Sequence, residues 1–377
     1  MKNRIITTVI IIFFIFVQGC GDRSAKQNMP PMLPPAETAK VVSPEVYNNL
    51  FFIKMFDDMS GWAISPTAVI RCDKGIWADV SPKDLSGISF GMANFANPNT
   101  GWVSTSKTGA TNINILRTVD GGKTWLTTDI APTEPGAVPT VKTINFVDAT
   151  HGWLAVSYGV GAGSEMVEVY QTINGGETWT LVASPRLRIA NSIPGGGLKT
   201  GLSFIDAQRG WLTGLWYGDT VWLYMSDDSG QTWKPQTIKV PAGYITQAGA
   251  VETRPPIFFG NNTGMLPLVA RSQGQAVIFY MTEDKGQTWK ATKAVKSTSN
   301  EPPIWSFVNS KTGFASDHIQ IFKTIDSGSS WKTIKPNLDF KAVTQIDFVT
   351  DQIGWGIGKG VFIKTADGGI SWSPAIK

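Results

Sequence analysis

The stretch Thr118-Val119-Asp120-Gly121-Gly122-Lys123-Thr124-Trp125 decides the fold, because five further segments of the chain repeat its pattern. Each segment has a hydroxyl residue, an Asp or Asn two positions later, a Gly four positions later and a Trp seven positions later. The other five begin at Thr172, Ser226, Thr282, Thr324 and Thr365. A shortened copy, Cys72-Asp73-Lys74-Gly75-Ile76-Trp77, precedes them. Such recurrence at intervals of tens of residues indicates a repeat architecture.

The residue types in this pattern predict a tight turn between two strands. A carboxylate or amide oxygen can accept hydrogen bonds from N–H groups of its own turn, and the glycine supplies a positive φ. The terminal tryptophan then covers the hairpin on its apolar side. We therefore expect a structural role for the six turn residues Asp120, Asn174, Asp228, Asp284, Asp326 and Asp367.

A second signature occurs seven times and consists of a large apolar residue followed by Gly and another large apolar residue. The copies are Phe56…Gly61-Trp62, Phe95…Gly101-Trp102, Phe146…Gly152-Trp153, Phe204…Gly210-Trp211, Phe259…Gly264-Met265, Phe307…Gly313-Phe314 and Phe348…Gly354-Trp355. Alternating runs between the signatures predict short strands. Four strands in about 47 residues are typical of a propeller blade. The sequence thus predicts an all-β fold, a single seven-bladed β-propeller of four-stranded blades.

The predicted propeller occupies residues 47–377, with blades starting near residues 51, 88, 140, 199, 254, 302 and 342. The sequence allows two ways in which the ring of blades could close. The last blade contains its own four strands and could close against the first, or Val41-Val42 could add an outer strand to it.

The N-terminus predicts a lipoprotein. Lys2 and Arg4 precede an apolar run that is too short to cross a bilayer, so residues 1–19 read as a signal peptide. The following Val17-Gln18-Gly19-Cys20 resembles the bacterial lipobox, which would make Cys20 the lipidated first residue of the mature chain. Residues 20–46 are rich in proline and polar residues and are expected to form a flexible tether. A plain secretory signal is the alternative.

Composition excludes several classes of protein. Two His and two Cys exclude Cys-rich zinc sites and multiple disulfides, and lipidation of Cys20 would leave Cys72 without a partner. A net charge of +4 over 377 residues is too weak for a nucleic-acid binder. We expect no cofactor and no metal.

The repeated turn resembles the Asp box, also called the bacterial neuraminidase repeat, with the pattern S/T-x-D-x-G-x-T-W. Asp boxes occur in sialidases, tandem-propeller xyloglucanases, sortilin-type receptors and the photosystem II stability and assembly factor family. The last family is most similar, since it combines a lipobox, one seven-bladed propeller and Asp boxes. The resemblance implies a lipid-anchored scaffold that binds a membrane protein through an Arg-rich face. Only Arg186, Arg188 and Arg254 fall in the loops concerned here, so we carry over the scaffold and not the photosynthetic role.

Candidate ligand-binding residues lie in the longer connections, which the strand order gathers on one face of the propeller. Loops on a rigid scaffold commonly carry function. The adjacent pair Trp216 and Tyr217 is the strongest candidate, because exposed aromatic residues in a loop are unfavourable unless they contact something. The full set is Tyr158, Arg186, Arg188, Lys199, Trp216, Tyr217, Asp219, Tyr244, Glu252 and Arg254.

These observations predict a monomeric, membrane-anchored extracytoplasmic binding or scaffold protein at the cell surface or in the periplasm. Its partner would be a protein or a glycan of the cell envelope, and its role would be to assist the assembly or stability of an envelope complex. The alternative is a carbohydrate-binding protein or a sialidase-like glycoside hydrolase. Asp219 and Glu252 could then form a carboxylate pair. The arginine-isoleucine-proline element of sialidases is missing, since Cys72 follows Arg71.

Overall fold

The computed structural model describes residues 41–83, 87–134, 136–187, 190–217, 220–244, 250–260, 262–271, 275–299 and 301–376. The expected signal peptide, Cys20 and most of the expected tether lie outside these ranges. Within them, no helix is long and apolar enough to cross a membrane.

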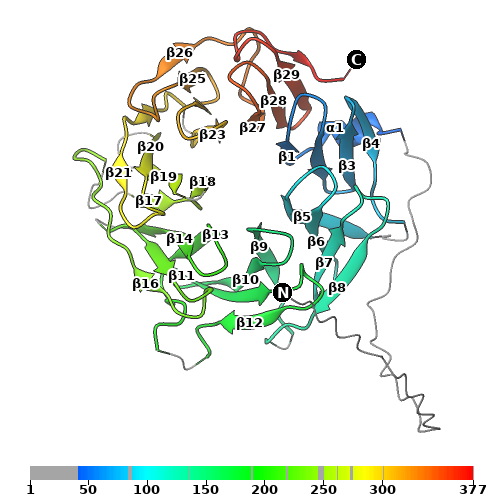
Figure 1. Cartoon of the computed structure of the whole chain (residues 1–377), viewed down its shortest axis with the longest axis vertical. Coiled ribbons are helices and arrows are strands. Elements are labelled where there is room, and N and C mark those ends of the chain that lie inside the picture. Colours follow the sequence, from blue (N-terminus) through cyan, green and yellow to red (C-terminus); the bar gives the residue numbers. More distant parts are fainter. Residues whose placement is uncertain are drawn as a thin grey trace, which may run out of the picture.

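The strands form six antiparallel sheets arranged in a ring around a central channel (Figure 1). Five sheets have four strands each, and in each of them neighbouring strands follow one another in the sequence. They are β1–β4 (Phe52–Met55, Gly61–Ser65, Ala68–Asp73, Ile76–Asp79), β5–β8 (Ile88–Phe95, Gly101–Lys107, Ile113–Thr118, Leu126–Ile130), β9–β12 (Thr140–Phe146, Gly152–Gly161, Ser164–Thr172, Thr180–Ala183), β23–β26 (Ile304–Phe307, Gly313–Ser316, Ile321–Thr324, Lys332–Ile334) and β27–β30 (Val343–Phe348, Gly354–Gly358, Val361–Thr365, Ser373–Pro374). This is the all-β propeller architecture expected from the sequence.

The sixth sheet has ten strands, because β17 joins two neighbouring sets of strands. Its members are β13–β16 (Leu198–Phe204, Gly210–Tyr217, Leu223–Ser226, Lys234–Pro235), β17 (Ala250–Thr253) and β18–β22 (Ile257–Phe259, Thr263–Arg271, Gln275–Thr282, Lys290–Ala291, Val295–Lys296). Strand β17 pairs with β14 on one side and with β19 on the other. A connection that the sequence predicts as a loop thus ties the two sets together.

Aromatic rings hold neighbouring sheets together. Trp62, Trp102 and Trp153 each stack on the Phe that ends the inner strand of the next sheet. The ring centroids of Trp102 and Phe146, for example, lie 3.5 Å apart. Trp179 of the repeated turn then meets the edge of Phe146 at 5.8 Å. The glycine allows this packing, because a Cβ on Gly152 would lie 2.4 Å from the Phe146 ring. These tryptophans are therefore structural, as their place in the repeat predicts.

The six repeated turns share one set of hydrogen bonds. In the first of them, Thr118 donates to Asp120, which accepts from both the backbone N–H and the hydroxyl of Thr124, at 2.9 and 2.6 Å. The Thr118 hydroxyl also accepts the N–H of Gly122. The turns of Asp228, Asp284, Asp326 and Asp367 repeat this arrangement. In the turn of Asn174 the amide oxygen likewise accepts the N–H of Thr178, but the amide nitrogen donates to the Thr178 hydroxyl.

The ring closes sheet against sheet. Strand β30 is the outer strand of the last sheet, and Val41-Val42 lies in no strand. Instead Val42 is buried in the core between the first and last sheets. The short helix α1 (Pro44–Asn48) follows it, and Tyr47 stacks on Phe362 of β29. Of the two closures that the sequence left open, the structure has the first.

Candidate functional site

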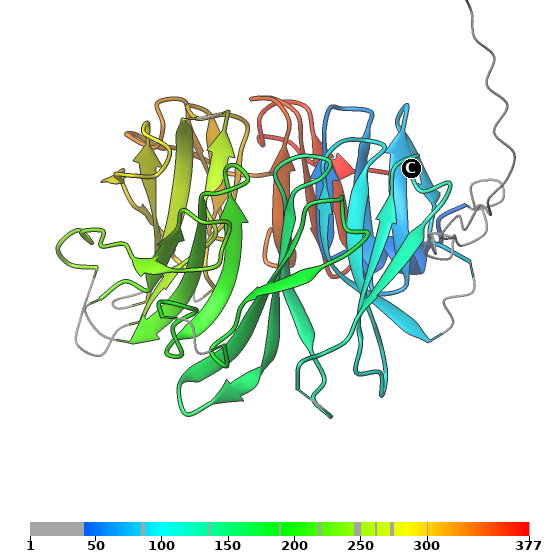
Figure 2. The same ribbon diagram turned by 60° about the horizontal axis from the view of Figure 1, so that its bottom comes forward.

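The ten candidate residues do not form a single site. Arg188 and Asp219 lie outside the described residues, so the expected carboxylate pair is not described. The other eight divide among the β10–β11 hairpin, which reaches the lower edge of the ring in Figure 2, the connection after β12, and the ten-stranded sheet with its connections.

The sequence predicted that Trp216 and Tyr217 lie in a loop, but they are the last two residues of strand β14. Trp216 pairs with Val251 of β17, and Tyr217 pairs with Ala250. The loop prediction was wrong because the partner strand lies in a distant connection that no local pattern indicates. Successive side chains of a strand point to opposite faces. Their exposed fractions are 38% and 69%.

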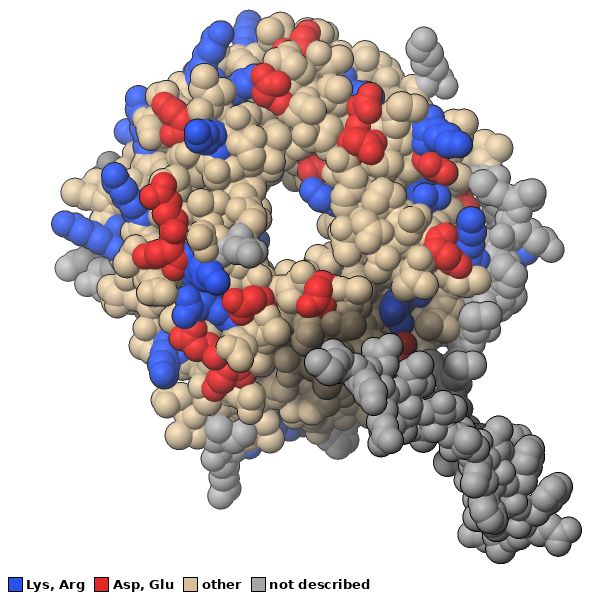
Figure 3. Space-filling model, in the orientation of Figure 1, with Lys and Arg blue, Asp and Glu red and all other residues tan. Residues whose placement is uncertain are grey.

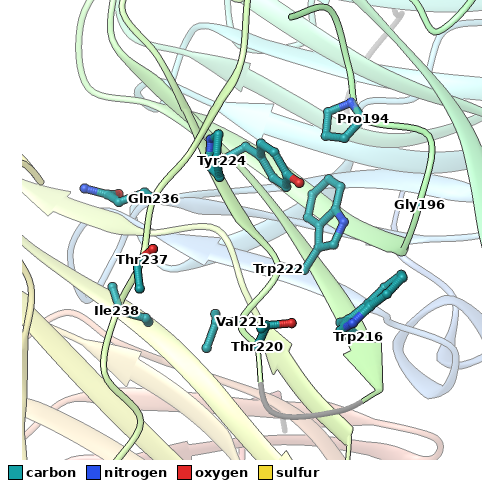
Figure 4. Close-up of a pocket in the computed structure, with 11 residues that line it drawn as sticks. Pro194, Gly196, Trp216, Thr220, Val221, Trp222, Tyr224, Gln236, Thr237 and Ile238 are labelled. Atoms are coloured by element: carbon teal, nitrogen blue, oxygen red, sulfur yellow. The ribbon is translucent and has the colours of Figure 1, made fainter.

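Trp216 borders a pocket of about 440 Å³ that we call the tryptophan pocket (Figure 4). Trp222 and Tyr224 lie side by side in it, with ring centroids 4.6 Å apart. Figure 4 shows Pro194 and Gly196 on one side and the segment 236–238 on the other. The pocket thus brings together three aromatic residues from β14, from β15 and from the position just before β15.

Lys199, expected as a surface ligand residue, is buried, with 1% of its surface exposed. Its ammonium donates to the backbone carbonyl oxygens of Glu165, Gly195, Gly196 and Gly197, at 2.9, 3.1, 2.9 and 3.3 Å. It also lies 5.1 Å from the centre of the Trp222 ring. Burial lowers the pKa of Lys199 to about 8, although the nearby Glu165 opposes the shift. Lys199 therefore supports the wall of the tryptophan pocket from behind.

Glu252 is also buried, and two arginines surround it. Its carboxylate lies 2.5 Å from the guanidinium of Arg254 and 2.6 Å from that of Arg271. The Nε–H groups of both arginines are buried without a hydrogen-bond partner among the described residues. Arg271 is not among the ten candidate residues, because its place opposite β17 follows from a pairing that no local pattern predicts.

Arg254 borders a second pocket, of about 290 Å³, that we call the channel-side pocket. Pro302, Pro303 and Trp305 form its apolar part, and Gln345 of the inner strand β27 lies opposite. Labels β23 and β27 lie beside the central opening in Figure 1. The pocket therefore combines a partly exposed guanidinium with flat apolar side chains.

The remaining candidates are packed against the protein itself. Tyr158 is half-buried and shares a hydrogen bond with Tyr170, which donates to the buried carboxylate of Glu168 at 2.9 Å. Burial raises the pKa of Tyr158. Arg186 forms an ion pair with Glu134, and Tyr244 packs on the hydrophobic core of the ten-stranded sheet.

The face shown in Figure 3 carries no large patch of a single charge. Acidic and basic side chains alternate around the face in Figure 3, which is open at its centre. Within the described ranges, no three His, Cys, Asp or Glu side chains gather in a way that could hold a metal ion.

Comparison with known proteins identifies the fold alone. No family model and no curated protein matches the chain. Among solved structures, YCF48 bound to a D1 peptide has a TM-score of 0.54 at 16% identity, over 89% of this chain and 97% of that chain. Oligogalacturonate lyase from Vibrio parahaemolyticus has a TM-score of 0.55 at 9% identity, over 90% and 98%. An ancestral GH74 enzyme has a TM-score of 0.50 at 13% identity, over 86% of this chain and 48% of that chain. These structures include a peptide-bound protein and two enzymes, so what they show for this chain is the propeller fold alone.

Proposed function

We propose that this protein is a membrane-anchored extracytoplasmic scaffold that binds a segment of an envelope protein and assists the assembly or stability of its complex. The channel-side pocket carries the proposal. Its arginine can bind a peptide carbonyl or carboxylate oxygen, while Pro302, Pro303 and Trp305 pack on apolar side chains. The Arg254 side chain is partly exposed although it pairs with Glu252, so a partner can reach its guanidinium group.

The similarity to YCF48 supports a protein partner, since that propeller was solved with a peptide bound. We infer seven blades for the present chain, in which the ten-stranded sheet counts as two blades, β13–β16 and β18–β21, bridged by β17. The six turns have the residues and hydrogen bonds expected of Asp boxes, so we place the chain among Asp-box propellers.

We propose binding rather than catalysis. A general acid or base must reach its substrate with a free carboxyl group. The Glu252 carboxylate is instead buried between two guanidinium groups. This environment suits a structural ion-pair cluster better than the catalytic pair of a glycosidase.

Lipidation at Cys20 would place the scaffold at a membrane facing away from the cytoplasm. Fractionation of cells expressing Cys20→Ser tests this part of the proposal. We expect the variant in the soluble fraction and the wild type in the membrane fraction. Equal distribution of the two would contradict anchoring without bearing on the pocket.

The partner is tested by recovery from detergent-solubilised envelope, followed by an array of overlapping peptides from the recovered protein. We expect one peptide to bind wild-type protein and to lose at least about tenfold in affinity for Arg254→Ala, because a charged hydrogen bond is removed. Arg186→Ala is the matched control, since Arg186 is a partly exposed, ion-paired arginine elsewhere. Equal loss in both variants, or none in either, would contradict the assignment of the site.

A further inference from the structure

The side chains that line the tryptophan pocket are neutral. No Asp, Glu, Lys, Arg or His is among the described residues that border it. A charged ligand would lose its hydration there without gaining a counter-charge, which is unfavourable. The described lining of this pocket therefore suits an uncharged ligand.

The pocket nevertheless offers several unused hydrogen-bonding groups. Within the described part of the chain, the indole N–H groups of Trp216 and Trp222 and the hydroxyls of Thr220, Tyr224 and Thr237 make no hydrogen bond. The neighbouring Gln236 differs, because its amide already bonds to Trp211, Trp289 and two backbone carbonyls. The hydroxyls can both donate and accept, so the wall suits a ligand that does the same.

The wall of the pocket is held in place before any ligand binds. Lys199 fixes the turn at 195–197 through three carbonyl oxygens, and the backbone N–H of Glu165 donates to Gly197 at 3.2 Å. Gly197 has φ +79°, and a Cβ there would lie 2.6 Å from the indole nitrogen of Trp222. Binding to such a rigid wall loses little conformational entropy.

We propose that the tryptophan pocket binds a neutral carbohydrate, with the C–H face of a sugar ring packed on Trp216 and its hydroxyls bonded to the neutral groups of the wall. A pyranose ring combines an apolar face with hydroxyls that both donate and accept, which matches this lining. A pocket of about 440 Å³ also suits compact rings better than an extended peptide. This proposal is independent of the channel-side pocket, which shares no lining residue with this one.

Calorimetric titration of the full-length protein tests the proposal. The probes are cellotetraose, maltotetraose and tetra-N-acetylchitotetraose, in a polyoxyethylene detergent because a maltoside headgroup would compete. We expect one of them to bind, and Trp216→Ala to weaken it by about tenfold or more through the lost stacking surface. Tyr217→Ala is the matched control on the same strand and should stay within about twofold.

Two further measurements keep the result interpretable. Thermal unfolding must give the same midpoint for Trp216→Ala and wild type, and Trp216→Phe should restore part of the affinity because it keeps a ring. A fourth probe is the neutral peptide Pro-Pro-Met-Leu-Pro-Pro. The proposal is overturned if no sugar binds wild-type protein, if the variants bind sugar equally, or if the peptide alone binds and depends on Trp216.

Discussion

Asp347 of the last sheet accepts a hydrogen bond from the backbone N–H of Met55 in the first sheet, at 2.6 Å. Gln345, two residues earlier, bonds to both the N–H and the carbonyl of Ile53. Equivalent links join other neighbouring sheets, as Asn145 does with the N–H of Phe204. The first and last sheets are thus joined by the same kind of side-chain to backbone hydrogen bond as other neighbouring sheets, although the bonded residues are 292 positions apart in the sequence.

Replacing Asp347 should therefore weaken the contact between the first and last sheets. In Asp347→Ala the buried N–H of Met55 loses its acceptor, and we expect the free energy of unfolding in urea to fall by about 1–3 kcal/mol. Asp347→Asn keeps an oxygen at the same place and should lose less. An equal loss in both variants would contradict the role of the acceptor.

The contribution of Asp347 to the free energy of unfolding should decrease as pH rises. Burial raises the pKa of Asp347, and Lys54 and the hydrogen bond from the N–H of Met55 oppose this shift without cancelling it. The folded protein therefore holds this proton more tightly than the unfolded chain, and the charge becomes unfavourable as pH rises above the unfolded value of about 4. We expect the deficit of Asp347→Asn relative to wild type to be larger at pH 4 than at pH 7.

The Asp120 carboxylate should stabilise the folded protein through the hydrogen bonds of its turn, and this contribution should depend on pH. Burial alone would raise the pKa of Asp120, but its hydrogen bonds from Thr124 and Thr118 outweigh this and lower it. Asp120→Ala should lower the free energy of unfolding at pH 7 by about 1 kcal/mol, and the loss should disappear as pH falls through the folded pKa. Asp120→Asn is the control, because Asn174 also bonds to both groups of Thr178 in its own turn, accepting from the N–H and donating to the hydroxyl. Unfolding midpoints that are equal in all three proteins would contradict the turn's role.

The sequence predicts the strands, the turns and the aromatic packing because these depend on local patterns. Thr118, Asp120, Gly122 and Trp125 specify their own hairpin within eight residues. The site depends on pairings between distant segments, such as Trp216 with Val251 of β17, and no local pattern marks them. For the same reason Lys199 was expected at the surface, although the Gly195–Gly197 turn and Glu165 enclose it.

The Gly-Trp signature is tested by adding one methyl group. In Gly152→Ala the new Cβ would lie 2.4 Å from the Phe146 ring and disturb its stacking on Trp102. We expect the free energy of unfolding to fall by about 1–3 kcal/mol, as in other overpacked cores. Gly161→Ala is the control on the same strand, since no atom lies within 4 Å of its Cβ. Equal unfolding curves for Gly152→Ala and wild type would contradict the packing argument.

Lys199 should make stability depend on pH above neutrality. Burial lowers its pKa to about 8, and Lys142 adds to this while Glu165 opposes it. An unfolded lysine has a pKa of about 10.4, so between these values the unfolded chain binds more protons than the folded protein. The contribution of this group to stability therefore rises with pH over that window, by up to about 3 kcal/mol.

The matched variant Lys199→Met removes this titration and leaves all other groups unchanged. We expect the difference in free energy of unfolding between wild type and variant to shift in favour of wild type from pH 8 to pH 10. Deprotonation of Lys199 also leaves two N–H groups for four carbonyl acceptors. Because the Lys199 nitrogen lies 5.1 Å from the centre of the Trp222 ring, the indole N–H resonance of Trp222 should titrate near pH 8 in the wild type alone. Parallel stability curves together with a Trp222 signal that does not move would show that the ammonium is not the group holding this wall.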